Sequence, residues 1–162
     1  MADGTIITSV TEALAVCISI IESANSEAVY ISPPSLLVLG SQFGLREKTK
    51  TLTQKGGRIR GIADFSYQYM SEMRDILDTG TDLRHFPQYQ GVLMLVGDKR
   101  ESISSMGVSA KSFSIDSPIV LLWSDDSTYA EFLVSAFETA WGQSISATQR
   151  IEELLKEGPS DI

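Results

Sequence analysis

The chain has 162 residues, 43% hydrophobic and 21% charged, with 21 Asp and Glu against 13 Lys and Arg; this is the size of one globular domain. The formal charge of −8 argues against binding nucleic acid or anionic lipid over a whole face. One Cys and one His exclude a disulfide framework within the chain and a metal site with several Cys or several His ligands. We therefore expect a reduced, cytoplasmic protein without cofactor or metal.

The first predicted element is a helix over residues 8–25, because apolar residues recur there at helical spacing. Ser9 and Glu12 have the spacing of a capping box at its start. Its apolar stretch is not a signal peptide, since no Lys or Arg precedes Arg46 and a signal peptide needs a basic start.

Strands and helices then alternate along the chain. A strand at 28–32 ends at two prolines, and a helix then runs from Ser35 to the glycine pair 56–57. A strand at 58–64 and a helix from Ser66 to Gly80 follow. A short strand is predicted at 82–86. The helix before Gly80 carries an apolar face of Tyr69, Met70, Met73, Ile76 and Leu77, which is most simply packing.

The second half is rich in strands. They are predicted at 92–96, 102–106, 112–115 and 119–123, and the short turns between them favour hairpins. A helix follows the pair Asp125-Asp126, and one of its faces is expected to carry Tyr129, Phe132, Leu133, Ala136, Ala140 and Trp141. Ser146 and Gln149 cap a final helix.

These elements predict an α/β fold: one mixed sheet flanked by helices on both faces, parallel in its early part and antiparallel in the later hairpins. One domain is expected over residues 1–158, followed by a flexible tail at 159–162. No apolar run approaches the ~20 residues that cross a bilayer.

Six Lys and Arg crowd into residues 46–60 with only Glu47 against them. This cluster is either a patch for phosphate or an acidic partner, or a solvated set of cations at the end of a helix. We favour the second interpretation, because no aromatic side chain or phosphate-cradling glycine loop accompanies the cations.

Arg84 and His85 end a short strand and form the most interesting polar pair. Arg84 is suited to clamp a carboxylate or phosphate, and His85 titrates near neutral pH. The alternative is an Arg paired with Asp82 or Asp64 beside an imidazole bonded to backbone, and the sequence leaves both open. Asp98 fits the corner of a hairpin, while Cys17 lies on the apolar face of the first helix as core.

Four segments, in this order, carry a resemblance to a known fold. They are residues 56–60 (Gly-x-x-Ile-Arg), Arg84-His85, Asp98 in its turn, and residues 137–141 (Phe-Glu-x-x-Trp). Over residues 9–157 the chain resembles the phospholipase D-like fold, and in particular the small sensor domains of that fold in archaeal histidine kinases and sugar-responsive transcriptional regulators.

The resemblance implies a relative without catalytic activity. Active phospholipase D-type enzymes resemble one another in a His-x-Lys-x-x-x-x-Asp run, whose His is the nucleophile and whose Lys binds phosphate. Aligning its Asp with Asp98 puts Gly91 at the His position and Leu93 at the Lys position. His85 lies 13 residues before Asp98 instead of seven, and pairing two identical chains does not restore the missing groups.

The resulting hypothesis is a ligand-sensing or regulatory domain of signal transduction or transcription. Its pocket is expected where strand C-terminal ends meet loops, which nominates Ser32, Asp64, Arg84, His85 and Asp98. Arg84 would hold an anionic or polar group and His85 would donate a hydrogen bond.

The expected partners are an unidentified small molecule, anionic or sugar-like, a second copy of the chain in a homodimer, and a separate kinase or DNA-binding output protein. No direct contact with nucleic acid or a membrane is expected. The alternatives are a ligand-free interaction module and a vestigial phosphodiesterase or nuclease that uses His85.

Overall fold

The computed structural model describes residues 4–87, 92–105 and 114–159. In these ranges the chain forms one eight-stranded sheet in the order β1-β7-β6-β5-β2-β3-β4-β8. The strands are β1 (Gly4–Ile7), β2 (Glu27–Ile31), β3 (Arg58–Ala63), β4 (Asp82–His85), β5 (Met94–Gly97), β6 (Glu101–Ser105), β7 (Leu121–Ser124) and β8 (Ile145–Ser146).

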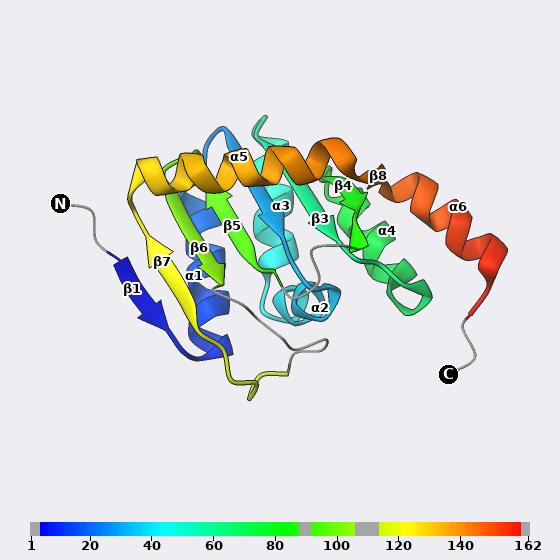
Figure 1. The fold of residues 1–162 in the computed structure, drawn as a ribbon, viewed down its shortest axis with the longest axis horizontal. Helices are drawn as coiled ribbons and strands as arrows, with labels where there is room; N and C mark the ends of the chain where they lie inside the picture. The colour runs from blue at the N-terminus through cyan, green and yellow to red at the C-terminus, as the bar shows by residue number, and fades with distance from the viewer. Residues whose placement is uncertain (1–3, 88–91, 106–113, 160–162) are drawn as a thin grey trace.

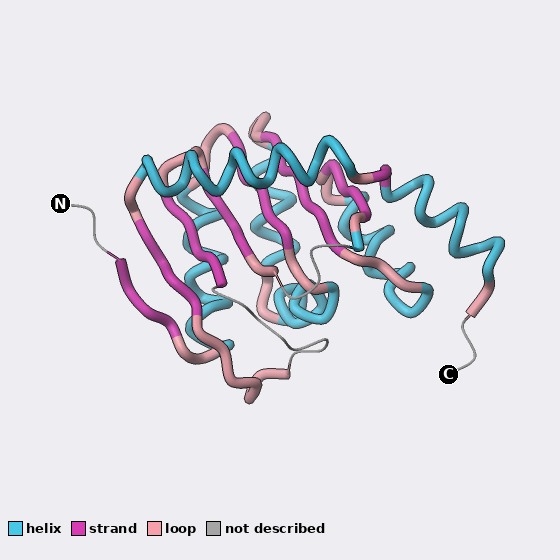
Figure 2. The backbone as a smooth tube through the Cα atoms, viewed as in Figure 1, coloured by secondary structure: helices cyan, strands magenta, loops and turns pink. Residues whose placement is uncertain are grey.

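Helices cover both faces of the sheet, as predicted (Figures 1 and 2). Helices α1–α4 lie on one face, α5 crosses the other, and α6 continues beyond the β8 edge. Their bounds are α1 (Val10–Ser23), α2 (Pro34–Gln42), α3 (Leu45–Gln54), α4 (Met70–Asp78, after a 3₁₀ turn at Tyr67–Tyr69), α5 (Ser127–Gln143) and α6 (Ala147–Glu157). None of the helices in the described ranges is long and apolar enough to cross a membrane.

The strand directions confirm the predicted mixed sheet. Strands β2, β3 and β4 are parallel, whereas β5, β6 and β7 form antiparallel pairs and β5 runs antiparallel to β2. The C-terminal ends of β2–β4 therefore lie at one end of the sheet, beside α2, and the β5–β6 turn lies at the opposite end (Figure 1).

Helix starts follow the predicted caps. Ser9 Oγ accepts the Glu12 amide hydrogen at 3.0 Å, and Ser146 Oγ accepts that of Gln149 at 3.1 Å. The helix after Asp125-Asp126 is capped by the second aspartate, whose carboxylate accepts from Thr128 N at 2.8 Å. Capping thus accounts for Asp126.

Apolar side chains form three clusters around the sheet. One lies between α1–α3 and the sheet, one between α5 and the sheet, and one joins α4 and α6 to strands β3 and β4. Cys17 belongs to the first cluster, as expected, and is 6% exposed.

The sequence predicts one helix from Ser35 to residue 55, but the structure has two helices there, α2 and α3. The chain turns between them at Gly44, whose φ of 91° favours glycine, and Phe43 beside it is 46% exposed. Strands β1 and β8 are also additions to the prediction, because they are short and lack an alternating apolar pattern.

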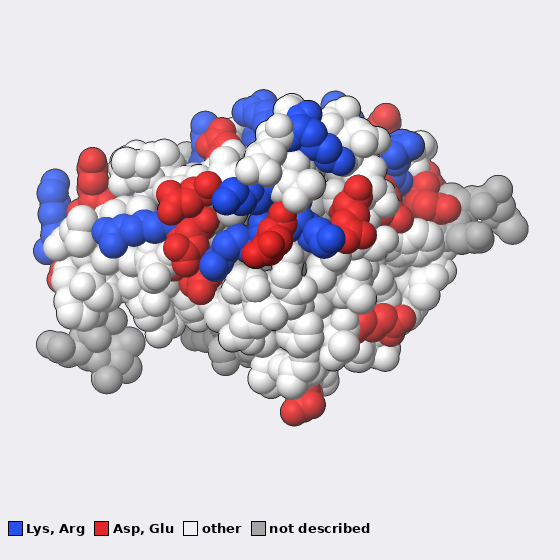
Figure 3. Space-filling model, turned by 180° about the vertical axis from the view of Figure 1, so that it is seen from behind, with Lys and Arg blue, Asp and Glu red and all other residues white. Residues whose placement is uncertain are grey.

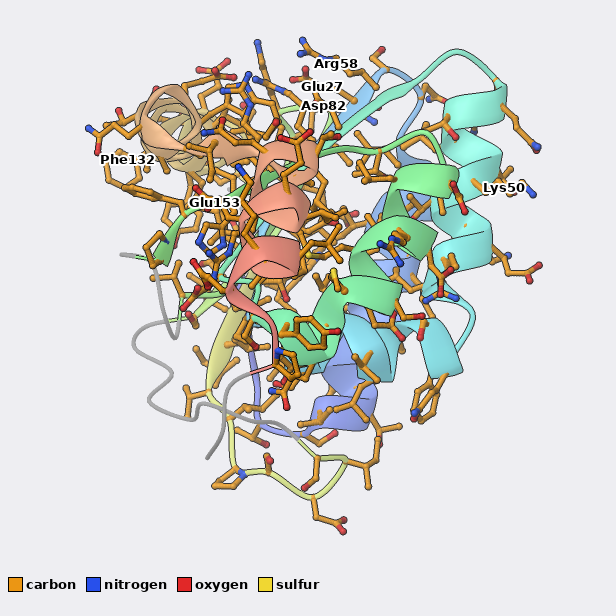
Figure 4. All side chains as sticks on the ribbon, turned by 90° about the vertical axis from the view of Figure 1, so that its right-hand side faces the viewer. Glu27, Lys50, Arg58, Asp82, Phe132 and Glu153 are labelled. Carbon is orange, nitrogen blue, oxygen red and sulfur yellow. The ribbon has the colours of Figure 1, made fainter. Side chains whose placement is uncertain are left out.

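Two further expectations are corrected. Phe132, expected on the buried face of α5, is 67% exposed and points away from the sheet (Figure 4), because the buried stripe runs through Ala130, Leu133, Val134 and Phe137. Of the strand expected at 112–115, residues 112 and 113 lie outside the described ranges and Ser114 starts a turn closed by Ser117. Residue 106 and residues 160–162 also lie outside them.

Candidate functional site

A cavity of about 70 Å³ lies between the sheet and helices α1–α4, at the end of β2. Its walls come from α1, α2, α3, the end of α4, β2 and the start of β5. The apolar wall consists of Leu14, Cys17, Ile21, Tyr30, Leu36, Leu37, Leu45, Ile76 and Leu93–Leu95. A volume of this size with such a lining fits a small, mainly apolar group.

Most of the polar side chains in the wall already have hydrogen-bond partners. The hydroxyls of Ser41, Thr49 and Thr79 donate to carbonyl oxygens three or four residues earlier, at 2.7, 2.9 and 2.6 Å. Ser32 Oγ donates to the Pro33 carbonyl at 3.0 Å. These hydroxyls therefore present mainly their carbon atoms and leave the cavity apolar in character.

Arg46 differs from these residues. Its Nη2 lies 2.7 Å from Glu72 Oε2 and its Nη1 lies 3.5 Å from Asp75 Oδ2, so it ties α3 to α4. Its Nε is buried and has no hydrogen-bond partner among the described residues. Arg46 also lines a polar groove of about 430 Å³ between α3 and α4, so it stands where the apolar cavity meets this outer groove.

The ionisable groups of the wall are not nucleophiles at neutral pH. Burial raises the pKa of the Cys17 thiol to about 12, and burial likewise raises the pKa of the Tyr30 hydroxyl above its ordinary value. Both stay protonated. In the part of the chain that the structure describes, no group of three or more His, Cys, Asp or Glu could hold a metal ion.

Of the residues nominated from the sequence, Ser32 lines the cavity, while Asp64 and His85 lie together near α6. His85 Nδ1 accepts the Phe65 amide hydrogen at 2.9 Å and is 3.8 Å from Asp64 Oδ1. Burial and then the charge of Arg150 lower the pKa of His85, against the opposing charges of Asp64 and Glu153. A neutral imidazole thus fixes the loop after β3.

Arg84 and His85 lie on opposite faces of the sheet, because consecutive residues of a strand alternate. Arg84 lies under α5, where Nη1 donates to the Trp141 carbonyl at 2.9 Å and Cζ is 4.0 Å from the centre of the Trp141 ring. The structure therefore does not bring the two side chains to one ligand.

Asp98 lies at the other end of the sheet from Ser32 and Asp64. Its carboxylate accepts three backbone hydrogens, from Asn25, Ser26 and Glu27, at 2.8, 2.9 and 2.9 Å. Burial alone would raise the pKa of this carboxyl, but the three amides, with Arg100, hold it below its ordinary value. Asp98 ties the β5–β6 turn to the segment between α1 and β2.

The Gly-x-x-Ile-Arg and Phe-Glu-x-x-Trp segments meet between β3 and α5. The buried Arg60 forms an ion pair with Glu138, and its guanidinium lies 5.1 Å from the Phe137 ring centre and 5.4 Å from that of Trp141. The hydrogen bond from Arg60 holds the pKa of Glu138 below its usual range. These motif residues fix α5 on the sheet.

The cations of residues 46–60 are interleaved with carboxylates on the surface. Lys48 pairs with Glu22 at 2.7 Å, and Arg58 lies 3.8 Å from Asp82, beside which it is seen in Figure 4. On the face formed by α1–α4, red and blue side chains alternate along the upper part (Figure 3). The cluster is a mixed-charge surface rather than a uniformly basic one.

Neither Arg46 nor the cavity was predicted as a site from the sequence. Arg46 was one of several clustered cations, and its two carboxylate partners lie more than 25 residues away on another helix. The available signal was an Arg at the start of α3, directly after the apolar residues Phe43 and Leu45, and this pattern also fits a solvated side chain.

Comparisons with solved structures identify the fold as phospholipase D-like. TrmBL2, described as an archaeal chromatin protein with a novel mode of DNA binding, matches with a TM-score of 0.69 and 13% identity over 89% of this chain and 54% of its own. Nuc from Salmonella typhimurium, a phospholipase D family member, matches with a TM-score of 0.69 and 13% identity, over 90% of this chain and 98% of its own. NucT from Helicobacter pylori matches with a TM-score of 0.68 and 14% identity, over 90% of this chain and 99% of its own.

The chain thus spans about half the length of TrmBL2 and nearly all of the other two. No known family model matches the sequence, and a search of the curated proteins finds no match.

Proposed function

We propose that this phospholipase D-like domain is a non-catalytic regulatory domain that binds a small molecule in the apolar cavity beside α2. The observation that carries the proposal is the place of Leu93. It stands where the resemblance puts the phosphate-binding Lys of the enzymes, it is 5% exposed, and it lines the cavity.

Phosphodiester cleavage at this position lacks support. The reaction needs a nucleophile and a cation that binds the phosphate. At the position of the cation stands Leu93, which is surrounded by apolar side chains. At the position of the nucleophile stands Gly91, which lies outside the described residues. The imidazole of His85 is engaged with the Phe65 amide near α6. A cavity that binds rather than reacts is the simpler use of this arrangement.

The cavity favours a small, mainly apolar ligand over the anionic or sugar-like one expected from the sequence. Its volume is about 70 Å³, against roughly 150 Å³ for a cavity that holds benzene. A ligand of about four non-hydrogen atoms, at a ceiling near −1.5 kcal/mol per atom, binds no more tightly than roughly 40 μM. Ligands should therefore be tested at millimolar concentrations.

As a regulatory domain the chain would report ligand occupancy to an output partner. Such a role fits the similarity to about half of TrmBL2, which is described as binding DNA in a novel mode. The partner would be a kinase or a DNA-binding protein, and the domain would act as a homodimer.

Thermal unfolding against a panel of small ketones, alcohols, ethers and organic acids tests the proposal. Saturation at 100 times the dissociation constant adds about 2.7 kcal/mol, or roughly 5–10 °C for a domain of this size. Cys17 offers matched variants, because Cys17→Leu fills the cavity and Cys17→Ala enlarges it.

A shift that disappears in Cys17→Leu and survives in Cys17→Ala supports a ligand in the cavity. A shift of equal size in both variants places the ligand elsewhere, and no shift with any compound contradicts the proposal.

The second candidate is a protein-interaction module, favoured by the exposed apolar side chains Phe132 and Ile6. They are 67% and 61% exposed. Ile6 points to the α5 side, since its neighbour Ile7 belongs to the core on the α1 side. Sedimentation of the wild type and Phe132→Ser over a range of concentrations tests it: self-association that the variant loses, together with no thermal shift for any compound of the panel, would favour this module over the ligand-binding one.

A further inference from the structure

Arg46 determines what kind of polar group the cavity accepts. We infer that the cavity binds a small neutral molecule that carries a hydrogen-bond acceptor, such as a ketone or ether oxygen, and that Arg46 Nε donates to this acceptor. The inference rests on the proposed function and names the ligand class of that site.

The guanidinium of Arg46 has one buried donor without an acceptor among the described residues. Both terminal nitrogens of Arg46 face carboxylates, Nη2 at 2.7 Å from Glu72 and Nη1 at 3.5 Å from Asp75. Nε is buried and lacks a partner among the described residues, although Arg46 lines the cavity. A buried N–H without an acceptor is unfavourable, and a ligand that supplies one oxygen removes this cost.

The charges around Arg46 disfavour an anionic ligand. The single positive charge of Arg46 faces two carboxylates, so the cluster of Arg46, Glu72 and Asp75 is net negative. The adjoining groove adds Lys50, Glu47 and Asp78, which leaves the surroundings net negative as well. A carboxylate or phosphate ligand would be repelled, whereas a neutral acceptor gains the hydrogen bond without that repulsion.

The size and lining of the cavity limit the rest of the ligand. A cavity of about 70 Å³ is roughly half of one that holds benzene, which limits the ligand to a molecule on the order of three to five non-hydrogen atoms. The rest of the wall is apolar, its Ser and Thr hydroxyls donate to backbone carbonyls, and the Tyr30 hydroxyl lies over Gly61 of β3. The ligand is therefore apolar apart from one acceptor.

The experiment compares three probes on the whole chain by NMR titration of the cavity methyl groups. Acetone and acetate are close in shape and differ in charge, while xenon tests for an open apolar cavity without any hydrogen bond. We expect xenon to bind, and acetone to bind at least tenfold more tightly than acetate.

Two variants isolate the role of Arg46. Arg46→Lys keeps a charge for Glu72 but removes the Nε donor, and it should weaken acetone about tenfold while leaving xenon unchanged. Glu72→Gln with Asp75→Asn removes two negative charges and should raise the affinity for acetate.

The outcomes separate the two proposals. If neither xenon nor acetone binds, the cavity is not a ligand site, and both the proposed function and this inference fall. If xenon binds but acetate equals or exceeds acetone, or if Arg46→Lys leaves acetone affinity unchanged, the cavity remains a binding site and the ligand class is overturned.

Discussion

Replacing Asp98 should destabilise the fold strongly if its role is to hold the α1–β2 segment rather than to bind a ligand. The carboxylate accepts the amide hydrogens of Asn25, Ser26 and Glu27 at 2.8–2.9 Å, and its side chain is 12% exposed. Asp98 also has a left-handed backbone, with φ of 51°. A substitution at Asp98 therefore removes hydrogen bonds and also changes how readily the backbone adopts the left-handed conformation.

The three hydrogen bonds to Asp98 account for most of the expected loss of stability. A hydrogen bond to a charged group contributes about 1.5–3 kcal/mol. Water can replace the carboxylate at the exposed amides of Asn25 and Ser26 but less readily at the part-buried amide of Glu27, so the three bonds together contribute about 2–3 kcal/mol. Alanine adds about 1 kcal/mol for the left-handed conformation, which Asn tolerates.

We therefore expect Asp98→Ala to lower the free energy of unfolding by about 3–4 kcal/mol and Asp98→Asn by about 2 kcal/mol. Urea unfolding followed by fluorescence of Trp123 and Trp141 measures both. Because the pKa of Asp98 is depressed in the folded state, its stabilisation is present above the ordinary Asp pKa near 3.9 and is lost as the pH falls through the folded value.

The difference between wild type and Asp98→Asn should accordingly narrow below about pH 4. A loss under about 1 kcal/mol for Asp98→Ala at pH 7 would refute the structural role and return Asp98 to the candidates for ligand binding.

Three further predictions concern single contacts. The chain has one histidine, so its imidazole NMR signals report His85 alone, and the pKa that they give should lie below 6.5. The free energy of unfolding should fall as the pH drops from 6.5 toward the pKa of His85 in the folded state. The variant His85→Asn should abolish this pH dependence. Gly61→Ala should cost about 1–3 kcal/mol in urea unfolding, because the new Cβ would lie 2.2 Å from Tyr30 Cζ; an unchanged midpoint would contradict the close approach. Glu138→Ala should cost about 1–3 kcal/mol, since it leaves the buried guanidinium of Arg60 without its carboxylate, and Glu138→Gln should recover part of the loss in the same assay.

Much of the fold was predictable because periodic apolar spacing and caps decide it locally. The first helix, the parallel β2–β3–β4 unit and the β5–β6 hairpin follow from such signals. The break at Gly44 was missed, since residues 35–55 contain no proline and the chain reverses there through one left-handed glycine. Strands β1 and β8 depend on partners far along the chain, β7 and β4, which local patterns do not reveal.

The site was harder to predict than the fold. The alternation of side chains along a strand already separates Arg84 from His85, but their adjacency in sequence suggested a common ligand. Arg60 and Arg84 belong to motifs that can be recognised in the sequence. Their partners Glu138 and Trp141 lie far along the chain on α5, so the sequence does not reveal the contacts. The cavity arises from six elements at once, so only the assembled fold locates it.

The pairing of β1 with β7 affects how the chain folds during synthesis. Ile7 stands opposite Leu121, and at about 5–20 residues per second the ~115 residues between them take roughly 6–23 s to be made. For that time β1 has no partner strand, and its backbone donors and acceptors are open to other chains. Strand β1 is thus made well before β7 but can enter the sheet only once β7 is available, so deleting β1 should slow or misdirect assembly of the β7 edge rather than of the β2–β3–β4 unit.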